Sequence, residues 1–179
     1  VGPYNVGGRT RAFAIDNSDS DVYFAGGVSG GVLKSIDAGA SWIRVTAPED
    51  HAAVSCISQD PRAGKSNIWY YGSGEVSGNS ASKSFSAYYR GSGIYKSTDD
   101  GDTWTLLEET AALIHKASDW DAVFRVLVDP VRADSDIVMA AMSEGIMRSN
   151  DGGDTWNTTL FANDAGFTDI QVTTSGTYY

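Results

Sequence analysis

One eight-residue phrase occurs three times in this chain of 179 residues and constrains its fold more than any other feature. Each copy has a serine, an aspartate two residues later, a glycine two residues further and a tryptophan three residues after that. The copies read SIDAGASW at 35–42, STDDGDTW at 97–104 and SNDGGDTW at 149–156. A phrase that recurs after roughly 50 to 60 residues predicts a repeat architecture.

Each copy lies between two short apolar runs, so we predict that it forms the turn of a β-hairpin. Its aspartate can accept hydrogen bonds from backbone N–H groups of the turn, and its glycine can supply a positive φ. Its tryptophan offers a large apolar area for burial against a neighbouring unit. The predicted structural residues are Ser35, Asp37, Gly39, Trp42, Ser97, Asp99, Gly101, Trp104, Ser149, Asp151, Gly153 and Trp156.

Calcium loops are the alternative interpretation of these acidic turns. Calcium takes six or more oxygen ligands, whereas the first copy contains a single carboxylate. His51 and His115 have no second His or Cys at a metal-binding spacing. We therefore predict no metal site and no other cofactor.

Aligning the chain on the three copies divides it into units of four short predicted strands. The units cover residues 10–46, 53–108 and 124–161, and a partial fourth unit covers 167–179. The predicted strands are 10–15, 21–25, 31–35 and 42–45; then 53–58, 67–71, 93–97 and 104–107; then 124–128, 136–140, 145–149 and 156–160; and finally 167–172 and 177–179. Only residues 108–120 could hold a helical turn, so the pattern predicts an all-β repeat protein.

The repeated phrase resembles the Asp-box, also called the bacterial neuraminidase repeat. This motif occurs in sialidases, xyloglucan hydrolases and sortilin-type receptors, and the resemblance implies a β-propeller of four-stranded antiparallel blades with Asp-box hairpins. A propeller needs about four to eight blades to close its ring, and this chain covers about three and a half. We therefore expect residues 1–179 to be the N-terminal part of one larger propeller domain.

The composition restricts the partners. The formal net charge is −10 and the isoelectric point is near 4.4, which argues against nucleic acid as a ligand. No apolar run is long enough to cross a bilayer, so we predict no membrane insertion. Cys56 is the only cysteine, which excludes an internal disulfide. Val1 does not begin a signal peptide, and we expect any export signal to have been removed or to lie outside the chain.

In a four-stranded blade the repeated turns lie at one end, and the variable connections lie at the other, where binding is usually found. The longest such connection spans residues 72–92. Its polar and aromatic side chains could contact a sugar or a peptide, and the candidates are Glu75, Phe85, Tyr88, Tyr89 and Arg90. A surface loop packed by its own aromatic residues is the alternative.

Three arginines lie on predicted innermost strands. Arg9 and Arg11 open the first strand of unit one, and we place Arg125 at the matching point of unit three. Facing the central channel, they could bind an anion such as a carboxylate. Ion pairs with neighbouring acids are the alternative in a chain with 23 acidic residues.

The resemblance also tests the enzyme hypothesis. Xyloglucan hydrolases of this fold use paired carboxylates, and their first catalytic aspartate falls on Val28 in the corresponding segment 25–34 of this chain. Sialidases carry an Arg-Ile-Pro-type motif near the start, which GGRTRAF at 7–13 lacks. We therefore expect neither catalytic site. A different site, built partly from Glu75, Asp119 and Asp121, is the alternative.

A closer resemblance covers nearly the whole chain. The runs GPYNVGGRTRAFAID, AGGVSGGVLKS, AVSCISQDP and YYRGSGIYKSTDDGDTW are similar to the sortilin-like propeller domains of large exported Bacteroidetes proteins. Such proteins often use the type IX secretion system, which implies an extracellular or cell-surface location and contact with secretion machinery through a region outside this chain. We predict a non-catalytic module that binds a glycan or protein, or serves as a scaffold. A glycan-active hydrolase with a non-standard site and a surface adhesin or structural component are the alternatives.

Overall fold

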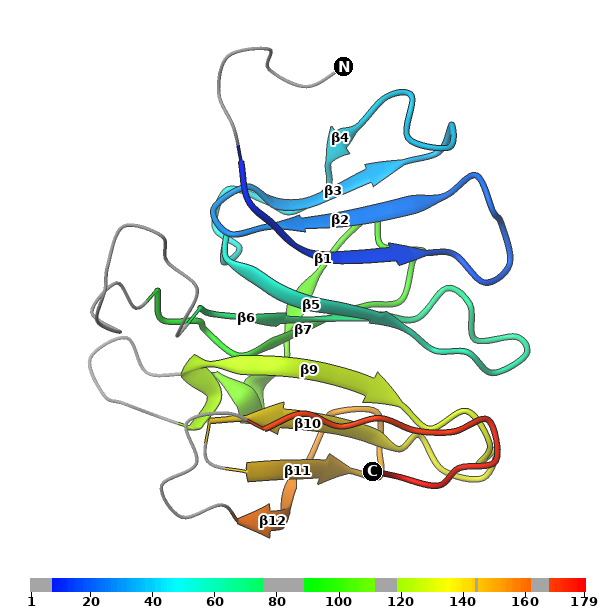
Figure 1. The fold of residues 1–179 in the computed structure, drawn as a ribbon, viewed down its shortest axis with the longest axis vertical. Coiled ribbons are helices and arrows are strands. Elements are labelled where there is room, and N and C mark those ends of the chain that lie inside the picture. Colours follow the sequence, from blue (N-terminus) through cyan, green and yellow to red (C-terminus); the bar gives the residue numbers. More distant parts are fainter. Residues whose placement is uncertain (1–7, 76–88, 112–118, 144, 162–167) are drawn as a thin grey trace.

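The computed structural model describes residues 8–75, 89–111, 119–143, 145–161 and 168–179. Its strands form three four-stranded antiparallel sheets. Within each sheet the strands pair in sequence order (Figure 1). The first sheet holds β1 (Thr10–Ile15), β2 (Tyr23–Gly27), β3 (Gly31–Ser35) and β4 (Ile43–Arg44). The second holds β5 (Val54–Gln59), β6 (Trp69–Ser73), β7 (Ile94–Ser97) and β8 (Thr105–Leu106), and the third holds β9 (Val123–Val128), β10 (Val138–Met142), β11 (Gly145–Ser149) and β12 (Asn157–Phe161).

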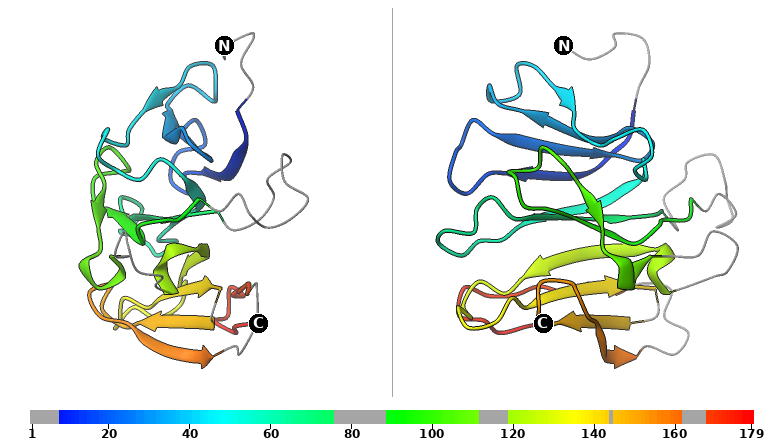
Figure 2. Two further views of the ribbon diagram at one scale, coloured as in Figure 1. Left: turned by 90° about the vertical axis from the view of Figure 1, so that its left-hand side faces the viewer. Right: turned by 180° about the vertical axis from the view of Figure 1, so that it is seen from behind.

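The three sheets follow one another along the long axis of the molecule (Figures 1 and 2). The first strands of successive sheets are neighbours, since β5 contacts both β1 and β9. Four-stranded meanders whose first strands lie side by side are the blades of a β-propeller. The predicted fold class, an all-β partial propeller with four-stranded blades, is confirmed.

The core lies between the blades. Between the first and second blades, Phe24 packs on Trp69 with ring centroids 4.4 Å apart, and Tyr71 stacks on Tyr95 at 4.5 Å. Phe24 and Trp69 are both fully buried, and burial of a side chain of this size contributes about 2–3 kcal/mol. Between the second and third blades the buried residues are mostly aliphatic, namely Tyr70, Ile94, Leu107, Val123, Val126, Val128, Val138, Ala140 and Met142.

The second strand of every blade begins two residues later than the sequence pattern predicts, at Tyr23, Trp69 and Val138. The reason is the turn that precedes it. Asp16 accepts a hydrogen bond from the Ser18 N–H at 2.6 Å, and the aspartates that directly follow β5 and β9 accept equivalent bonds from the N–H groups of residues 62 and 131. Such turns use aspartate to bind the backbone locally, which delays the start of the next strand.

The last described segment lies against the third blade. Val172 and Tyr178 form an isolated antiparallel bridge, and they pack with Ile170 against β9 and β10. The predicted strands 167–172 and 177–179 are therefore represented by this single bridge, with residue 167 outside the described part.

The segment 108–120 holds two short 3₁₀ turns, η1 (Glu108–Thr110) and η2 (Asp119–Asp121), with residues 112–118 outside the described part. In the described portion of the chain, no helix is long and apolar enough to cross a membrane.

Candidate functional site

The connections between strands separate into two ends of the molecule. The hairpin turns after β1, β3, β5, β7, β9 and β11 lie at one end, which we call the turn end (Figure 1). The connections after β2, β6 and β10, and those between blades, lie at the other, which we call the loop end. The three copies of the repeated phrase, hereafter the repeat turns, thus lie away from the variable connections.

The repeat turns use their polar side chains internally. In the first, Ser35 Oγ accepts from the Gly39 N–H at 2.9 Å, and Asp37 accepts from the backbone and hydroxyl of Ser41 at 2.8 and 2.6 Å. The glycines Gly39, Gly101 and Gly153 have φ of 87°, 77° and 105°. The same hydrogen bonds recur in the other two turns.

These bonds favour the ionised carboxylate. Hydrogen bonds from Ser41 lower the pKa of Asp37 to about 2, and those from Thr155 lower the pKa of Asp151 to about 2. Burial opposes the shift at Asp99, but the bonds from Thr103 and Ser97 still lower its pKa. Among the described residues, no group of three or more His, Cys, Asp or Glu side chains could hold a metal ion.

A lysine links each of the last two repeat turns to the blade before it. Lys34 of β3 donates to the carbonyl oxygen of Asp100 at 2.8 Å, and Lys96 of β7 donates to that of Gly152 at 2.9 Å. Sequence reasoning missed these contacts. The signal was present, because a Lys or Arg directly precedes the serine of all three phrases.

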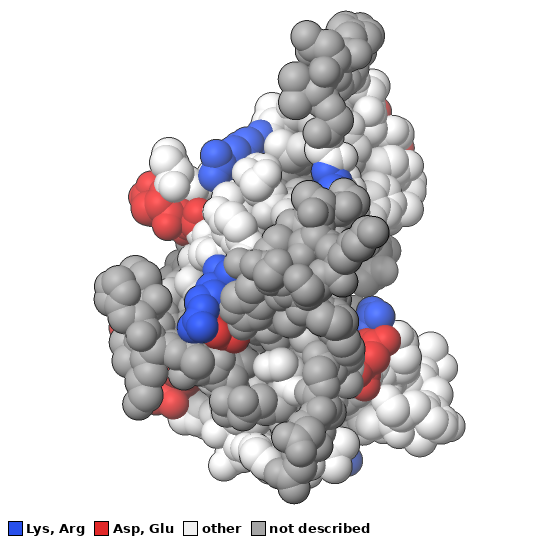
Figure 3. Space-filling view, turned by 60° about the vertical axis from the view of Figure 1, so that its left-hand side comes forward, with Lys and Arg blue, Asp and Glu red and all other residues white. Residues whose placement is uncertain are grey.

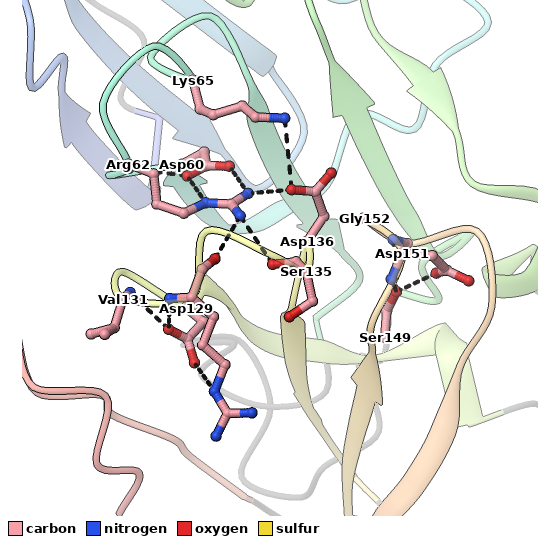
Figure 4. A network of polar contacts seen from close by, with 12 residues as sticks. Asp60, Arg62, Lys65, Asp129, Val131, Ser135, Asp136, Ser149, Asp151 and Gly152 are labelled. Atoms are coloured by element: carbon pink, nitrogen blue, oxygen red, sulfur yellow. Dashed lines mark hydrogen bonds and ion pairs between the residues drawn. The ribbon is translucent and has the colours of Figure 1, made fainter.

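A second polar network joins the turn ends of the second and third blades (Figure 4). Arg62 donates to Asp60 at 2.5 Å and to Asp136 at 2.7 Å. It also donates to the carbonyl oxygens of Arg132 and Ser135, both at 3.0 Å. The two carboxylates raise the pKa of Arg62, although its burial opposes the shift. Arg62 thus ties the turn after β5 to the turn after β9, which indicates a structural role for this arginine.

At the loop end, Glu75 is the buried centre of a charged cluster. Its side chain is 6% exposed, and Arg9 Nη2 lies 2.5 Å from both carboxylate oxygens. Only Oε2 has the geometry of a hydrogen bond, so Oε1 is buried without one. Arg11 Nη1 lies 3.7 Å from Oε1. The structure thus brings the predicted candidates Arg9 and Glu75 together as an ion pair between the first and second blades.

Tyr89 and His51 flank this cluster. Glu75 and Tyr89 exchange two backbone hydrogen bonds of 2.7 and 2.8 Å, and the Tyr89 ring meets the His51 ring edge-on at 5.5 Å. His51 Nδ1 accepts from the Ala53 N–H at 3.2 Å. Burial lowers the pKa of His51, against the opposing effect of hydrogen bonds with the Arg90 and Ala53 backbone. The neutral imidazole of His51 and the half-exposed ring of Tyr89 together form an aromatic surface beside the cluster.

Arg90 lies beside the same cluster. Its Nη1 is 3.3 Å from Asp121 Oδ2, and the Gly91 N–H donates to the Asp121 carbonyl oxygen at 2.7 Å. Asp119 begins η2. The other two candidates of the long loop, Phe85 and Tyr88, lie outside the described residues.

The placement of Arg125 corrects the sequence alignment. In the pairing of β9 with β10, Arg125 lies opposite Ala141. The equivalent positions in the first strands of the first two blades hold Ala12 and Cys56, so Arg125 does not match Arg9 or Arg11. The alignment failed because the sequence pattern starts the first strand of unit three at residue 124, whereas β9 begins one residue earlier, at Val123. Arg125 instead forms a two-point ion pair with Asp169.

Val28 lies at the loop end, in the β2–β3 connection. Its backbone N–H donates to the carbonyl oxygen of Arg9 at 3.1 Å. An apolar side chain at this position cannot transfer a proton. Position 28, which contacts the backbone of Arg9 in the Glu75 cluster, therefore adds no carboxylate to it.

Figure 3 looks towards the loop end. The basic and acidic side chains visible there form small separate groups rather than one continuous charged surface. This distribution agrees with the ion pairs of Arg9, Arg90 and Arg125, each of which sets a positive charge against a carboxylate.

No family model matches the chain, and no curated protein matches it. Solved structures do. The chain has the fold of propeller proteins. An ancestral GH74 enzyme matches 94% of it with a TM-score of 0.69 at 22% identity. YCF48 bound to D1 peptide matches 96% with a TM-score of 0.60 at 15% identity.

An extracellular domain from B. thetaiotaomicron matches 99% of the chain with a TM-score of 0.64 at 11% identity. At these identities the likeness shows the fold alone. The chain spans 21%, 47% and 20% of the lengths of these three proteins.

Proposed function

We propose that this chain is a non-catalytic binding or scaffold module of a β-propeller, with its ligand site in the Glu75 cluster at the loop end. The observation that carries the proposal is the state of Glu75. Its carboxylate is buried, and Arg9 Nη2 lies 2.5 Å from both of its oxygens, so the ion pair fixes the guanidinium at the loop end. A ligand at the loop end would meet the partly exposed guanidinium of Arg9, and Tyr89 beside it would supply a stacking surface.

A glycan is the ligand class that we favour. Sugar hydroxyls donate to carboxylates and accept from guanidinium groups, and the sugar ring packs on aromatic side chains. The cluster offers the last two of these contacts, through Arg9 and Tyr89, while the buried Glu75 holds the guanidinium in place. A peptide is the other ligand that an aromatic and charged loop end could bind, as YCF48 is described bound to one.

The module belongs to an exported protein in this proposal. The repeat turns carry the Asp-box pattern, and the chain resembles sortilin-like propellers of Bacteroidetes proteins that use type IX secretion. One observation supports this placement, since one structural neighbour is an extracellular domain from B. thetaiotaomicron.

A hydrolase with a non-standard site is the second candidate, because GH74 enzymes share the fold. Glycoside hydrolysis uses two carboxyl groups about 5 to 10 Å apart across the bond that breaks. Of the acids expected for such a site, Glu75, Asp119 and Asp121, two form ion pairs at the loop end, namely Glu75 and Asp121. Each has an arginine partner, Arg9 and Arg90 respectively, which agrees better with structural and binding roles.

One experiment separates the two. Xyloglucan oligosaccharides and other glycans would be screened for binding by calorimetry, with release of reducing ends measured in the same samples. We expect saturable binding that Tyr89→Ala weakens about tenfold, without new reducing ends. Ile36→Ala, an exposed change at the turn end, is the matched control. Glycan turnover that Glu75→Gln abolishes would establish the hydrolase instead, and absence of binding to any glycan would refute the ligand class.

A further inference from the structure

The third blade carries an apolar groove on its forward face, by which we mean the face of a blade that looks towards the next unit in the sequence. The groove has a volume of about 360 Å³. Its lining includes Met139, Ile146, Leu160, Ile170 and Tyr179. Leu160 and Tyr179 are 58% and 78% exposed, which is unusual for large apolar side chains that share one groove.

The forward faces of the first two blades are covered. Phe24 and Val32 of the first blade lie in one buried cluster with Trp69 and Trp104 of the second. Tyr70 of the second blade lies in another with Val138 of the third. In both cases a complete four-stranded blade provides the cover.

The forward face of the third blade is covered in part. Ile170 packs on Ile137 and Met139, so the segment 168–179 occupies the inner half of this face. The outer half, next to Leu160, is the groove. The described chain therefore leaves open the part of this face that strands three and four of a following unit would cover.

A repeated donor marks the same place. Lys34 and Lys96 reach the carbonyl oxygens of Asp100 and Gly152, which have φ of 60° and 75° in the next repeat turn. Arg148 holds the equivalent position in the third blade. Its Nε donates to Asn150 at 3.0 Å, and a guanidinium has four further N–H donors. Arg148 is paired in the β10–β11 register with Met139, a residue of the lining, so it lies beside the groove at the position from which Lys34 and Lys96 bind a repeat turn.

We propose that this groove is a docking site for a β-hairpin whose turn has the SxDxGxxW pattern and which lies outside residues 1–179. The hairpins of the chain itself are held in their own blades, so the occupant is an additional hairpin. The turn residue of this hairpin that has a positive φ, equivalent to Asp100 or Gly152, would accept a hydrogen bond from Arg148 through its carbonyl oxygen. Its tryptophan and flanking apolar residues would cover Ile146 and Leu160, as Trp104 covers the first blade.

The test uses the full chain and a fluorescent, backbone-cyclised peptide with the sequence of residues 93–107, in which ring closure holds the hairpin. Fluorescence anisotropy should show saturable 1:1 binding. Arg148→Glu and Leu160→Asp should each weaken it at least tenfold, whereas Arg148→Lys should retain most of it. Lys65→Glu, a charge reversal on an exposed lysine of the turn end, is the matched control and should bind like the unchanged protein.

A second peptide tests the turn. It carries Asp99→Ala and Gly101→Ala, keeps the same ring closure, and should bind at least tenfold more weakly. The proposal is overturned if the unchanged peptide does not bind, or if Arg148→Glu and Lys65→Glu bind it equally. It is also overturned if Phe13→Asp on the first blade, rather than Leu160→Asp, abolishes binding. Arg148→Gln replaces Arg148→Glu if circular dichroism shows that the latter is unfolded.

Discussion

Lys34 Nζ donates to the main-chain carbonyl oxygen of Asp100 at 2.8 Å, which joins β3 of the first blade to the repeat turn of the second. The same nitrogen lies 2.6 Å from Asp102 Oδ1 and 5.6 Å from the centroid of the Phe24 ring. The Lys34 side chain is only 9% exposed. A buried ammonium with two oxygen partners and an aromatic face is a strong contact between blades.

Lys34→Met should therefore destabilise the fold by about 2 kcal/mol, because it removes a charged hydrogen bond and leaves the carbonyl oxygen of Asp100 without this donor. Urea unfolding followed by tryptophan fluorescence measures the change. Lys65→Met is the matched control, since Lys65 is 41% exposed and 3.7 Å from its partner Asp136, and should change stability by less than about 1 kcal/mol. Equal losses in the two variants would show that the blade contact is unimportant.

Gly101 and Gly64 form a natural pair, because both have a φ of 77°. A methyl group at Gly101 would lie 2.5 Å from Phe24 Cε1, whereas one at Gly64 would meet no atom within 4 Å. Gly64→Ala should cost about 1 kcal/mol from the backbone alone, and Gly101→Ala about 1–3 kcal/mol more from overpacking. The difference between their urea unfolding free energies measures the packing of the turn on Phe24. Similar losses in the two variants would contradict a tight contact between this turn and Phe24.

Acid should weaken the repeat turns. Asp151 has a folded pKa of about 2 against an ordinary value of 3.8, so the unfolded chain binds its proton first as the pH falls. Its contribution is complete above about pH 4 and is lost as the pH falls towards 2. Asp151→Asn should lower the urea midpoint at pH 6 and have a much smaller effect at pH 2. An effect of equal size at both pH values would show that the charge of Asp151 does not matter.

Arg62→Ala should destabilise the protein by about 3–5 kcal/mol, since it leaves the carboxylate of Asp60 buried and unpaired. Asp60 is 1% exposed and Arg62 is 10% exposed. Arg132→Ala is the control, because Arg132 is 58% exposed and 4.0 Å from Asp129, and should cost less than about 1 kcal/mol. Thermal and urea unfolding report both changes. Replacing both partners, with Asp60→Leu and Arg62→Met, should recover part of the loss.

The fold followed from the sequence because the repeat turns fix both the hairpins and their spacing. The strands β1, β3 and β11 match their predicted ranges, and β3 and β11 end at the serine of the repeated phrase. Second strands were displaced because the carboxylates of Asp16, Asp60 and Asp129 bind the turn backbone in a way that strand propensity does not encode.

The candidate site was less accessible to sequence reasoning. The pairing of Arg9 with Glu75 spans 66 residues and depends on how two blades pack, which no local pattern specifies. The first strand of the third blade begins one residue earlier than the pattern predicts, so Arg125 lies one position further along its strand than Arg11 does, and it pairs with Asp169. His51 was treated only as a metal candidate, and its contact with Tyr89 arises from the same packing.

The lysine contacts join only blades that are adjacent in sequence, and this has a consequence for how the protein comes apart. Each blade is held by its neighbours alone, as in linear repeat arrays whose energy is a sum of unit and nearest-neighbour terms. Loss of one contact weakens one boundary and leaves the next intact. We expect hydrogen exchange to reveal opening in steps of whole blades, so that the middle blade, which has two boundaries, exchanges its amides last.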